Sequence, residues 1–134
     1  MKRNILGFGI ALLMTVSLAH AQENEKSDSP VFTTFPVSIF KDKYKPDAVL
    51  LDVRSLEEYK NGHIKGAVSM NINDKNFTEK IKSLKKENNI FVYCAEGGRS
   101  VEACEILIRE GFLYVYNLNG GYRDLVKAGM PNVK

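Results

Sequence analysis

Apolar runs and amphipathic segments alternate along most of the chain, and this alternation predicts strands separated by helices. Four short, mainly apolar runs have the length and composition of buried strands. They are residues 48–53 (AVLLDV), 67–72 (AVSMNI), 90–94 (IFVYC) and 113–118 (LYVYNL). Strands that alternate with helices belong to parallel sheets with both faces covered, so the pattern predicts an α/β domain.

Helices are predicted between and after these strands. The predicted helices are residues 56–62, residues 77–86, a segment from near Arg99 to Gly111, and a short segment after residues 120–121. In the second, Phe77, Ile81 and Leu84 recur at the spacing of one helix face. The third carries Val101, Cys104, Leu107 and Ile108 on one face, and a glycine ends it. The chain, at 134 residues, is long enough for one domain.

The first residues have the pattern of a targeting segment and not of the fold. Residues 1–21 begin with Lys2 and Arg3, continue with an apolar stretch and end in small residues, which predicts a secretory signal peptide. The apolar stretch is about 14 residues, short of the roughly 20 that a bilayer requires, although an uncleaved anchor is the alternative. Residues 22–31 are polar and predict a flexible lead-in. The folded domain is expected to span residues 32–134.

The net charge of the chain depends on whether the predicted signal peptide is removed. Removing Lys2 and Arg3 from 19 Lys and Arg residues leaves 17 against 16 Asp and Glu, a formal net charge of +1. The lysines near residues 80–86 have helical spacing and indicate a solvated helix face. No stretch of the sequence combines clustered Lys and Arg with interleaved aromatic residues, so nucleic acid is not an expected partner. We expect an exported protein, periplasmic or secreted, with no stable membrane insertion.

The two cysteines, Cys94 and Cys104, cannot build a disulfide framework. Cys94 ends a predicted strand and opens the loop CAEGGRS, residues 94–100. Gly97 and Gly98 allow the loop to curl so that its amides point inward, and Arg99 and the next helix add positive charge. These features favour a thiolate, which is the nucleophilic form of cysteine. The alternative is a buried, inert thiol, which is the interpretation we prefer for Cys104.

Three motifs in register resemble the signatures of rhodanese-like domains. The loop Cys94-Ala-Glu-Gly-Gly-Arg-Ser100 resembles the active-site pattern CxxGxRS. Residues 50–54 (LLDVR), with 58–59 (EY) and 62–67 (GHIKGA), resemble the first signature of the family. Residues 119–122 (NGGY) and 128–131 (AGMP) resemble its C-terminal signature. The resemblance covers residues 32–131.

This resemblance implies an open parallel sheet of about five strands flanked by helices. It also implies a sulfurtransferase in which Cys94 takes a sulfane sulfur from thiosulfate or a persulfide and passes it to a thiol or cyanide. No cofactor or metal is expected. The resemblance places substrate binding on Ala95, Glu96, Gly97, Gly98, Arg99, Ser100 and Arg54.

Two positions depart from the family pattern. Leu125 stands where the C-terminal signature often has tryptophan, which concerns packing more than chemistry. Glu96 places a carboxylate in a loop where thiosulfate-using members often carry a basic or neutral residue. A like charge beside a dianionic donor favours a less anionic sulfane donor, so the identity of the donor is open.

Other polar residues have both a structural and a functional interpretation. In the structural interpretation, Asp52 accepts hydrogen bonds from loop amides and Arg54 pairs with a nearby acid such as Glu58. We prefer it to the functional interpretation, in which Arg54 lines the mouth of the pocket. His63 is the one histidine outside residues 1–21, and a structural turn is preferred to a Cys-His dyad. One histidine and one loop cysteine do not supply the four ligands that zinc usually takes.

Two other functions compete with sulfur transfer. A rhodanese-like binding module without chemistry is the first alternative, although such versions usually lack the cysteine. A phosphatase or arsenate reductase on the same scaffold is the second. Those enzymes place one residue more between cysteine and arginine than the four between Cys94 and Arg99. The shorter loop here suits a sulfur atom better than a tetrahedral oxyanion. The oligomeric state is left open.

Overall fold

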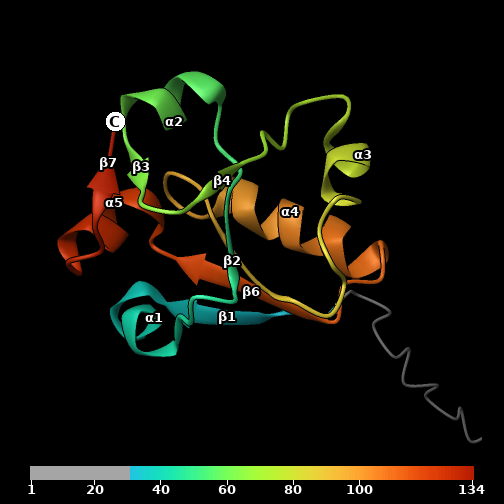
Figure 1. Ribbon diagram of the computed structural model, residues 1–134, viewed down its shortest axis with the longest axis horizontal. Coiled ribbons are helices and arrows are strands. Elements are labelled where there is room, and N and C mark those ends of the chain that lie inside the picture. Colours follow the sequence, from blue (N-terminus) through green and yellow to red (C-terminus); the bar gives the residue numbers. More distant parts are fainter. Residues whose placement is uncertain (1–30) are drawn as a thin grey trace, which may run out of the picture.

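The computed structural model describes residues 31–134 (Figure 1). The predicted signal peptide and all but the last residue of the predicted lead-in lie outside the described residues. The strands are β1 (Thr33–Pro36), β2 (Val49–Asp52), β3 (His63–Ile64), β4 (Val68–Ser69), β5 (Asn89–Tyr93), β6 (Tyr114–Asn119) and β7 (Asn132–Val133). The helices are α1 (Val37–Lys43), α2 (Leu56–Asn61), α3 (Phe77–Ile81), α4 (Gly98–Arg109) and α5 (Gly121–Lys127).

Five parallel strands form the central sheet in the order β1-β6-β5-β2-β4. This confirms the predicted α/β class and the parallel sheet. β5 lies in the middle of the sheet, with β2 on one side and β6 on the other. All five strands run in one direction, so the segments that follow β5, β2 and β6 meet at one edge of the sheet. Ligands bind at this edge in open parallel sheets, and Cys94 lies there.

Side chains of the central strands alternate between two hydrophobic cores. One core joins Val92 and Leu51 of the sheet to α3 and α4, including Cys104, whose side chain is fully buried. The other joins Phe91 and Leu50 to α1 and α5, where Leu125 is fully buried. Leucine therefore fills the position where the family often has tryptophan. Both faces of the sheet are covered, as the apolar composition of β2 and β5 requires.

Two predicted elements are shorter in the structure. Residues 67–72 form a regular strand only at Val68–Ser69. Beyond Ser69 the segment stays beside the end of β2, where the amides of Met70 and Ile72 donate to Asp52 O and Val53 O at 2.9 and 3.1 Å. The helix predicted over residues 77–86 ends at Ile81. Beyond it, the amides of Ser83 and Leu84 bond three residues back, at 3.2 and 3.0 Å, in the manner of turns.

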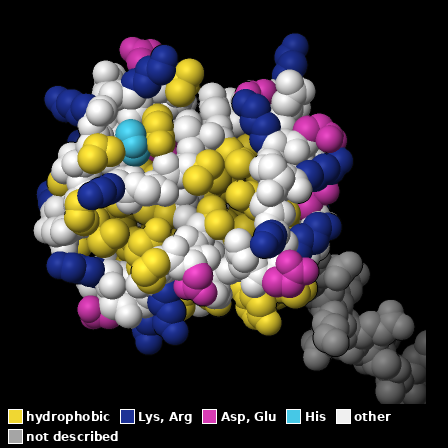
Figure 2. All heavy atoms as spheres, in the orientation of Figure 1, with side chains coloured by type: hydrophobic (Ala, Val, Ile, Leu, Met, Phe, Trp, Pro, Cys, Tyr) yellow, Lys and Arg dark blue, Asp and Glu magenta, His cyan; other side chains and the backbone are white. Residues whose placement is uncertain are grey.

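The pattern missed four elements. β1 is largely exposed and has no apolar run, and α1 begins directly after Pro36. β3 and β7 are two residues each and pair antiparallel, apart from the main sheet. Within residues 31–134, no helix has the length and apolar character needed to cross a membrane. Figure 2 shows apolar side chains in the middle of one face and charges of both signs around its edge.

Candidate active site

The Cys94 loop leaves β5 and turns directly into α4. Cys94 is 1% exposed, and the Gly97 amide donates a hydrogen bond to its Sγ at 2.9 Å. Gly97 adopts a φ of 128°, a conformation that favours glycine, and this lets the chain fold back over the sulfur. α4 then begins at Gly98, close to the position that the sequence predicts. The loop therefore presents backbone donors to the sulfur.

Ser100 completes the contacts of the sulfur. Its hydroxyl oxygen lies 3.5 Å from Cys94 Sγ and donates to Gly97 O at 2.8 Å. Burial raises the pKa of the Cys94 thiol. Hydrogen bonds from the Ser100 hydroxyl and from the amides of Ser100, Gly97 and Glu96 outweigh burial, so the pKa lies below the ordinary value for cysteine. The loop thus stabilises the thiolate.

Arg99 does not stand free beside the sulfur. It makes a two-pronged ion pair with Glu58 of α2, with nitrogen–oxygen distances of 2.8 and 2.9 Å. Hydrogen bonds from Arg99 and Ser55, despite partial burial, lower the pKa of Glu58 to about 2. The hydrogen bond to Glu58 is also the largest cause of the raised pKa of Arg99, and the Cys94 charge adds to it. The loop therefore carries a largely neutralised cation within electrostatic reach of Cys94.

Glu58 has a second role at the start of α2. The Ser55 side chain accepts from the Glu58 amide at 3.2 Å, and Glu58 Oε2 accepts from the Ser55 amide at 3.0 Å. This reciprocal arrangement is a capping box, which fixes the first turn of the helix. The sequence interpretation that paired Arg54 with Glu58 is wrong, because the helix start directs Glu58 toward Arg99 instead.

Arg54 pairs with Asp52, two residues earlier. Its Nε and Nη2 donate to Asp52 at 3.0 and 2.7 Å, and Nη2 also donates to Gly62 O at 2.7 Å. Tyr93 donates to the same carboxylate at 2.6 Å, and Tyr122 covers the guanidinium with its ring 4.2 Å away. Asp52 and Arg54 are 0% and 4% exposed. These contacts support the structural interpretation, and a substrate contact by Arg54 stays a prediction.

The start of α5 supports the Cys94 loop from behind. The Tyr122 amide donates to Cys94 O at 2.8 Å. Gly121 has a φ of 66°, and a Cβ at this position would lie 2.2 Å from Ala95 O. Only glycine fits such an approach. The sequence pattern predicts a short helix after residues 120–121 but not this contact, although a pair of glycines after a strand is a signal of close backbone approach.

The remaining candidates make no hydrogen bond to Cys94 Sγ. The His63 ring stacks on Tyr59 at 3.7 Å, and its Nδ1 lies 2.9 Å from Tyr59 O, which supports the structural interpretation. Burial raises the pKa of Cys104, so this thiol stays protonated. In the described part of the chain, no group of three His, Cys, Asp or Glu residues could hold a metal ion.

Two cavities border the loop. The first, here called the Cys94 cavity, has a volume of about 330 Å³ and is lined by residues 94–99. The second, here called the Arg123 cavity, has a volume of about 310 Å³. It is lined by Ala95, Glu96, Gly120, Tyr122, Arg123 and Asp124. The structure therefore gathers the predicted residues 94–99 around one hollow, with Ser100 buried next to the sulfur. Arg54 lines neither cavity.

Comparison with known proteins places these features in a family. A model described as "Rhodanese-like domain" matches residues 37–128. Thiosulfate sulfurtransferase 16, chloroplastic, of Arabidopsis thaliana is 32% identical over 114 residues, covering 78% of this chain and 95% of that protein. A tRNA uridine(34) hydroxylase of Cytophaga hutchinsonii is 38% identical over 91 residues, or 66% of this chain, but the match spans only 28% of that protein.

Solved structures agree with the fold. The rhodanese-like domain of an Anabaena sp protein, solved by solution NMR, has a TM-score of 0.67 and 28% identity, covering 77% of this chain and 80% of that chain. A rhodanese-related protein from Thermoplasma volcanium has a TM-score of 0.65 and 27% identity, covering 76% of this chain and 98% of that chain. These neighbours share the α/β architecture seen here.

Proposed function

The chain belongs to the rhodanese-like domain family, and from this premise we propose that it is a sulfurtransferase that carries a sulfane sulfur on Cys94. The observation that supports this proposal most is the hydrogen bond that the Gly97 amide donates to Cys94 Sγ at 2.9 Å. With Ser100, it holds the pKa of the thiol below its ordinary value. A Sulfurtransferase of Allochromatium vinosum, 30% identical over 87 residues, or 65% of this chain and 79% of that protein, also supports the assignment.

The reaction has two displacements at sulfur. The Cys94 thiolate attacks the sulfane sulfur of the donor, the bond between that sulfur and the rest of the donor breaks, and the donor leaves with its electron pair. A nucleophilic acceptor, such as a thiolate or cyanide, then attacks the terminal sulfur of the Cys94 persulfide. The sulfur–sulfur bond breaks, and its electron pair returns to Cys94 as a thiolate. No external oxidant or reductant is required.

Ser100 and the loop amides serve both displacements. The Ser100 hydroxyl has one proton, and it lies within reach of both Gly97 O and Cys94 Sγ. When Cys94 ionises, this proton turns from the carbonyl to the sulfur and stabilises the thiolate. The Gly97 amide favours the same charge. In the first displacement these donors raise the fraction of Cys94 that is present as the attacking thiolate. In the second they stabilise the charge that develops on Cys94 as it leaves, which lowers that barrier.

Charge around the loop favours a donor less anionic than thiosulfate. The carboxylate of Glu58 neutralises Arg99, and Glu96 is exposed beside the Cys94 cavity. The loop therefore offers a dianion less attraction than an unpaired arginine would. An organic persulfide or a monoanionic thiosulfonate is the better donor, and a thiol or cyanide is the acceptor.

Location is part of the same proposal. Residues 1–21 have the sequence pattern of a signal peptide, and they lie outside the described residues. On that pattern, the protein is exported to the periplasm or secreted, and works there without nucleic acid or stable membrane insertion.

Matched cysteine variants test the proposal. Thiocyanate formation from cyanide is measured with thiosulfate, a dianion, and with methanethiosulfonate, a monoanion, as donors. Cys94→Ser is expected to abolish it with both donors while its circular dichroism and melting match the wild type. Cys104→Ala is the control, because Cys104 is equally buried but lies on α4 away from the loop amides. A folded Cys94→Ser protein that retains turnover would contradict the proposal.

A further inference from the structure

The Arg123 cavity adjoins the Cys94 cavity and has no role in the displacements described above. The two share Ala95 and Glu96 in their linings, so they are neighbours, and a molecule with its sulfur at Cys94 has to pass Glu96 to reach the Arg123 cavity. A volume of about 310 Å³ is at the lower end for sites of small organic molecules. Inorganic thiosulfate would leave this space unused. The cavity therefore suits the organic part of a donor or acceptor.

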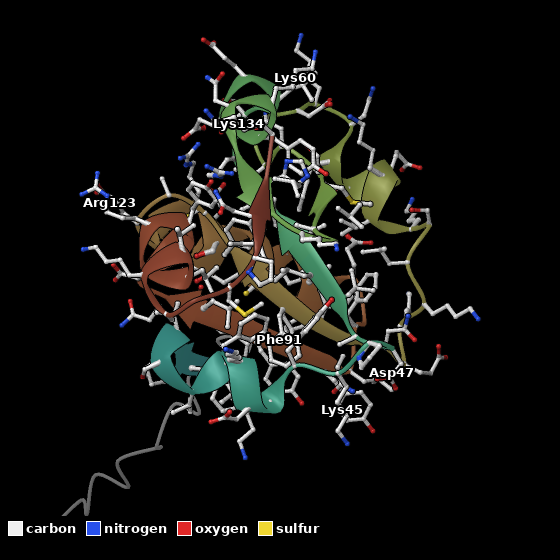
Figure 3. All side chains as sticks on the ribbon, turned by 60° about the vertical axis from the view of Figure 1, so that its left-hand side comes forward. Lys45, Asp47, Lys60, Phe91, Arg123 and Lys134 are labelled. Atoms are coloured by element: carbon white, nitrogen blue, oxygen red, sulfur yellow. The ribbon has the colours of Figure 1, made fainter. Side chains whose placement is uncertain are left out.

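The residues that line this cavity include charged side chains of both signs. Glu96, from the loop, and Asp124, from α5, supply carboxylates, and Arg123 supplies a guanidinium. Among the ion pairs of residues 31–134, none includes Glu96, Arg123 or Asp124. Arg123 projects outward from α5 (Figure 3). Its side chain is long and exposed, so it can fold over a ligand carboxylate.

We propose that the Arg123 cavity is a subsite for small thiols and persulfides that carry both an ammonium and a carboxylate group, a substrate class that rests on the proposed sulfur transfer. Glu96 receives the ammonium group and Arg123 receives the carboxylate, while the sulfur reaches Cys94. Arg99 cannot take the carboxylate without releasing Glu58. The same Glu96 that opposes an inorganic dianion thus selects a zwitterionic thiol.

The transfer step for such an acceptor balances without another reagent. The thiolate of the acceptor attacks the terminal sulfur of the Cys94 persulfide and forms a new sulfur–sulfur bond. The bond between that sulfur and Cys94 breaks, and Cys94 leaves as a thiolate with the electron pair. The acceptor becomes a persulfide, and its proton is lost to water. The reverse reaction loads Cys94 from a zwitterionic persulfide.

Three acceptors that differ only in their charged groups test the subsite. Cysteine carries both groups, cysteamine lacks the carboxylate, and 3-mercaptopropionate lacks the ammonium. Cys94 is loaded from methanethiosulfonate, and loss of the bound sulfur is followed by intact mass at several acceptor concentrations. Each acceptor is compared between variant and wild type, so its own thiol reactivity cancels.

Arg123→Gln is expected to raise the half-saturating concentration of cysteine and of 3-mercaptopropionate about three- to fivefold, the scale of an exposed ion pair. The change for cysteamine is expected to be smaller. Arg123→Lys should recover part of the loss, and Lys127→Gln, another exposed cation on α5, should change none of the three values. Equal effects of Arg123→Gln on all three acceptors, or on none, would overturn the proposal.

A binding measurement separates this inference from the proposed function. S-methylcysteine cannot exchange sulfur, so its binding to the Cys94→Ser protein is followed by amide chemical shifts. Shifts at residues 95–97 and 120–124 that weaken in Arg123→Gln support the subsite, even if the wild type takes up no sulfur. Sulfur uptake by the wild type without any such shifts would overturn the subsite and leave the sulfur transfer standing.

Discussion

Replacing Glu58 by glutamine isolates the ion pair that holds Arg99 to α2. Glutamine keeps the shape of the side chain, and its amide oxygen still accepts from the Ser55 amide, so the capping box survives. What is lost is the negative charge opposite Arg99, at nitrogen–oxygen distances of 2.8 and 2.9 Å. The substitution therefore tests the ion pair without removing the helix start.

The magnitude follows from the exposure of the pair. The side chains of Arg99 and Glu58 are 32% and 36% exposed, so solvent screens much of their attraction. A two-pronged pair of this exposure contributes about 1 kcal/mol to the free energy of unfolding. In a domain of this size, Glu58→Gln should lower Tm by about 4 °C at neutral pH.

The loss should depend on pH with a definite sign. The pKa of Glu58 is about 2 in the folded protein, against 4.5 for an ordinary glutamate. A carboxyl group whose pKa is lowered by folding stabilises the protein above its unfolded pKa, and this contribution is lost as pH falls toward the folded value. The stability gap between wild type and Glu58→Gln should therefore be full above about pH 5 and shrink between pH 4.5 and 2.

Urea denaturation of both proteins at several pH values between 7 and 3 measures this gap. The wild-type advantage should diminish steadily below pH 4.5 and should also shrink in high salt. A gap that stays constant from pH 7 to 3 would show that glutamine disturbs packing and that the ion pair contributes nothing. A Glu58→Gln protein as stable as the wild type at pH 7 would refute the reasoning outright.

Three further substitutions, the last with a matched control, address the loop and its supports. Cys104→Ala should cost about 1 kcal/mol and keep most of the thiocyanate-forming activity, whereas a folded but inactive protein would indicate a two-cysteine relay. Glu96→Gln should raise kcat/KM for the dianion thiosulfate about tenfold at low salt, the effect of removing one like charge at about 6 Å in a dielectric near that of water, and about threefold for the monoanion methanethiosulfonate. An equal gain for both donors at every salt concentration would rule out repulsion as the cause. Gly121→Ala should cost about 2–4 kcal/mol, because its Cβ would meet Ala95 O, while Gly98→Ala, whose Cβ would meet nothing within 4 Å, should be tolerated in urea denaturation.

The central strands and the Cys94 loop could be predicted from the sequence because their signals are local. A short continuous apolar run such as residues 90–93 is typical of a strand covered on both faces, and it pairs with β2 and β6 here. The sharp turn at residues 97–98 could also be predicted, because glycine adopts the backbone angles that such a turn requires. β1 could not be found this way, because it is mostly exposed and its residues pair with β6, far along the chain.

The partners of the charged residues were harder to predict. Arg99 and Glu58 lie 41 positions apart, and the choice between Arg54 and Arg99 as partner depends on how α2 is oriented. One available signal was the spacing of Ser55 and Glu58, which is that of a capping box and commits the Glu58 side chain to the helix start. The Arg123 cavity had no sequence signal, because α5 and the loop after β5 form it together.

The measurement that tests the central claim most directly is the mass of the protein after incubation with a sulfane donor, followed by location of the added sulfur. The wild type should gain one sulfur atom, peptide mapping should place it on Cys94, and cyanide should remove it. The Cys94→Ser protein should gain none. A folded wild-type protein that gains no sulfur from thiosulfate or methanethiosulfonate, or that carries it on Cys104, would contradict the account.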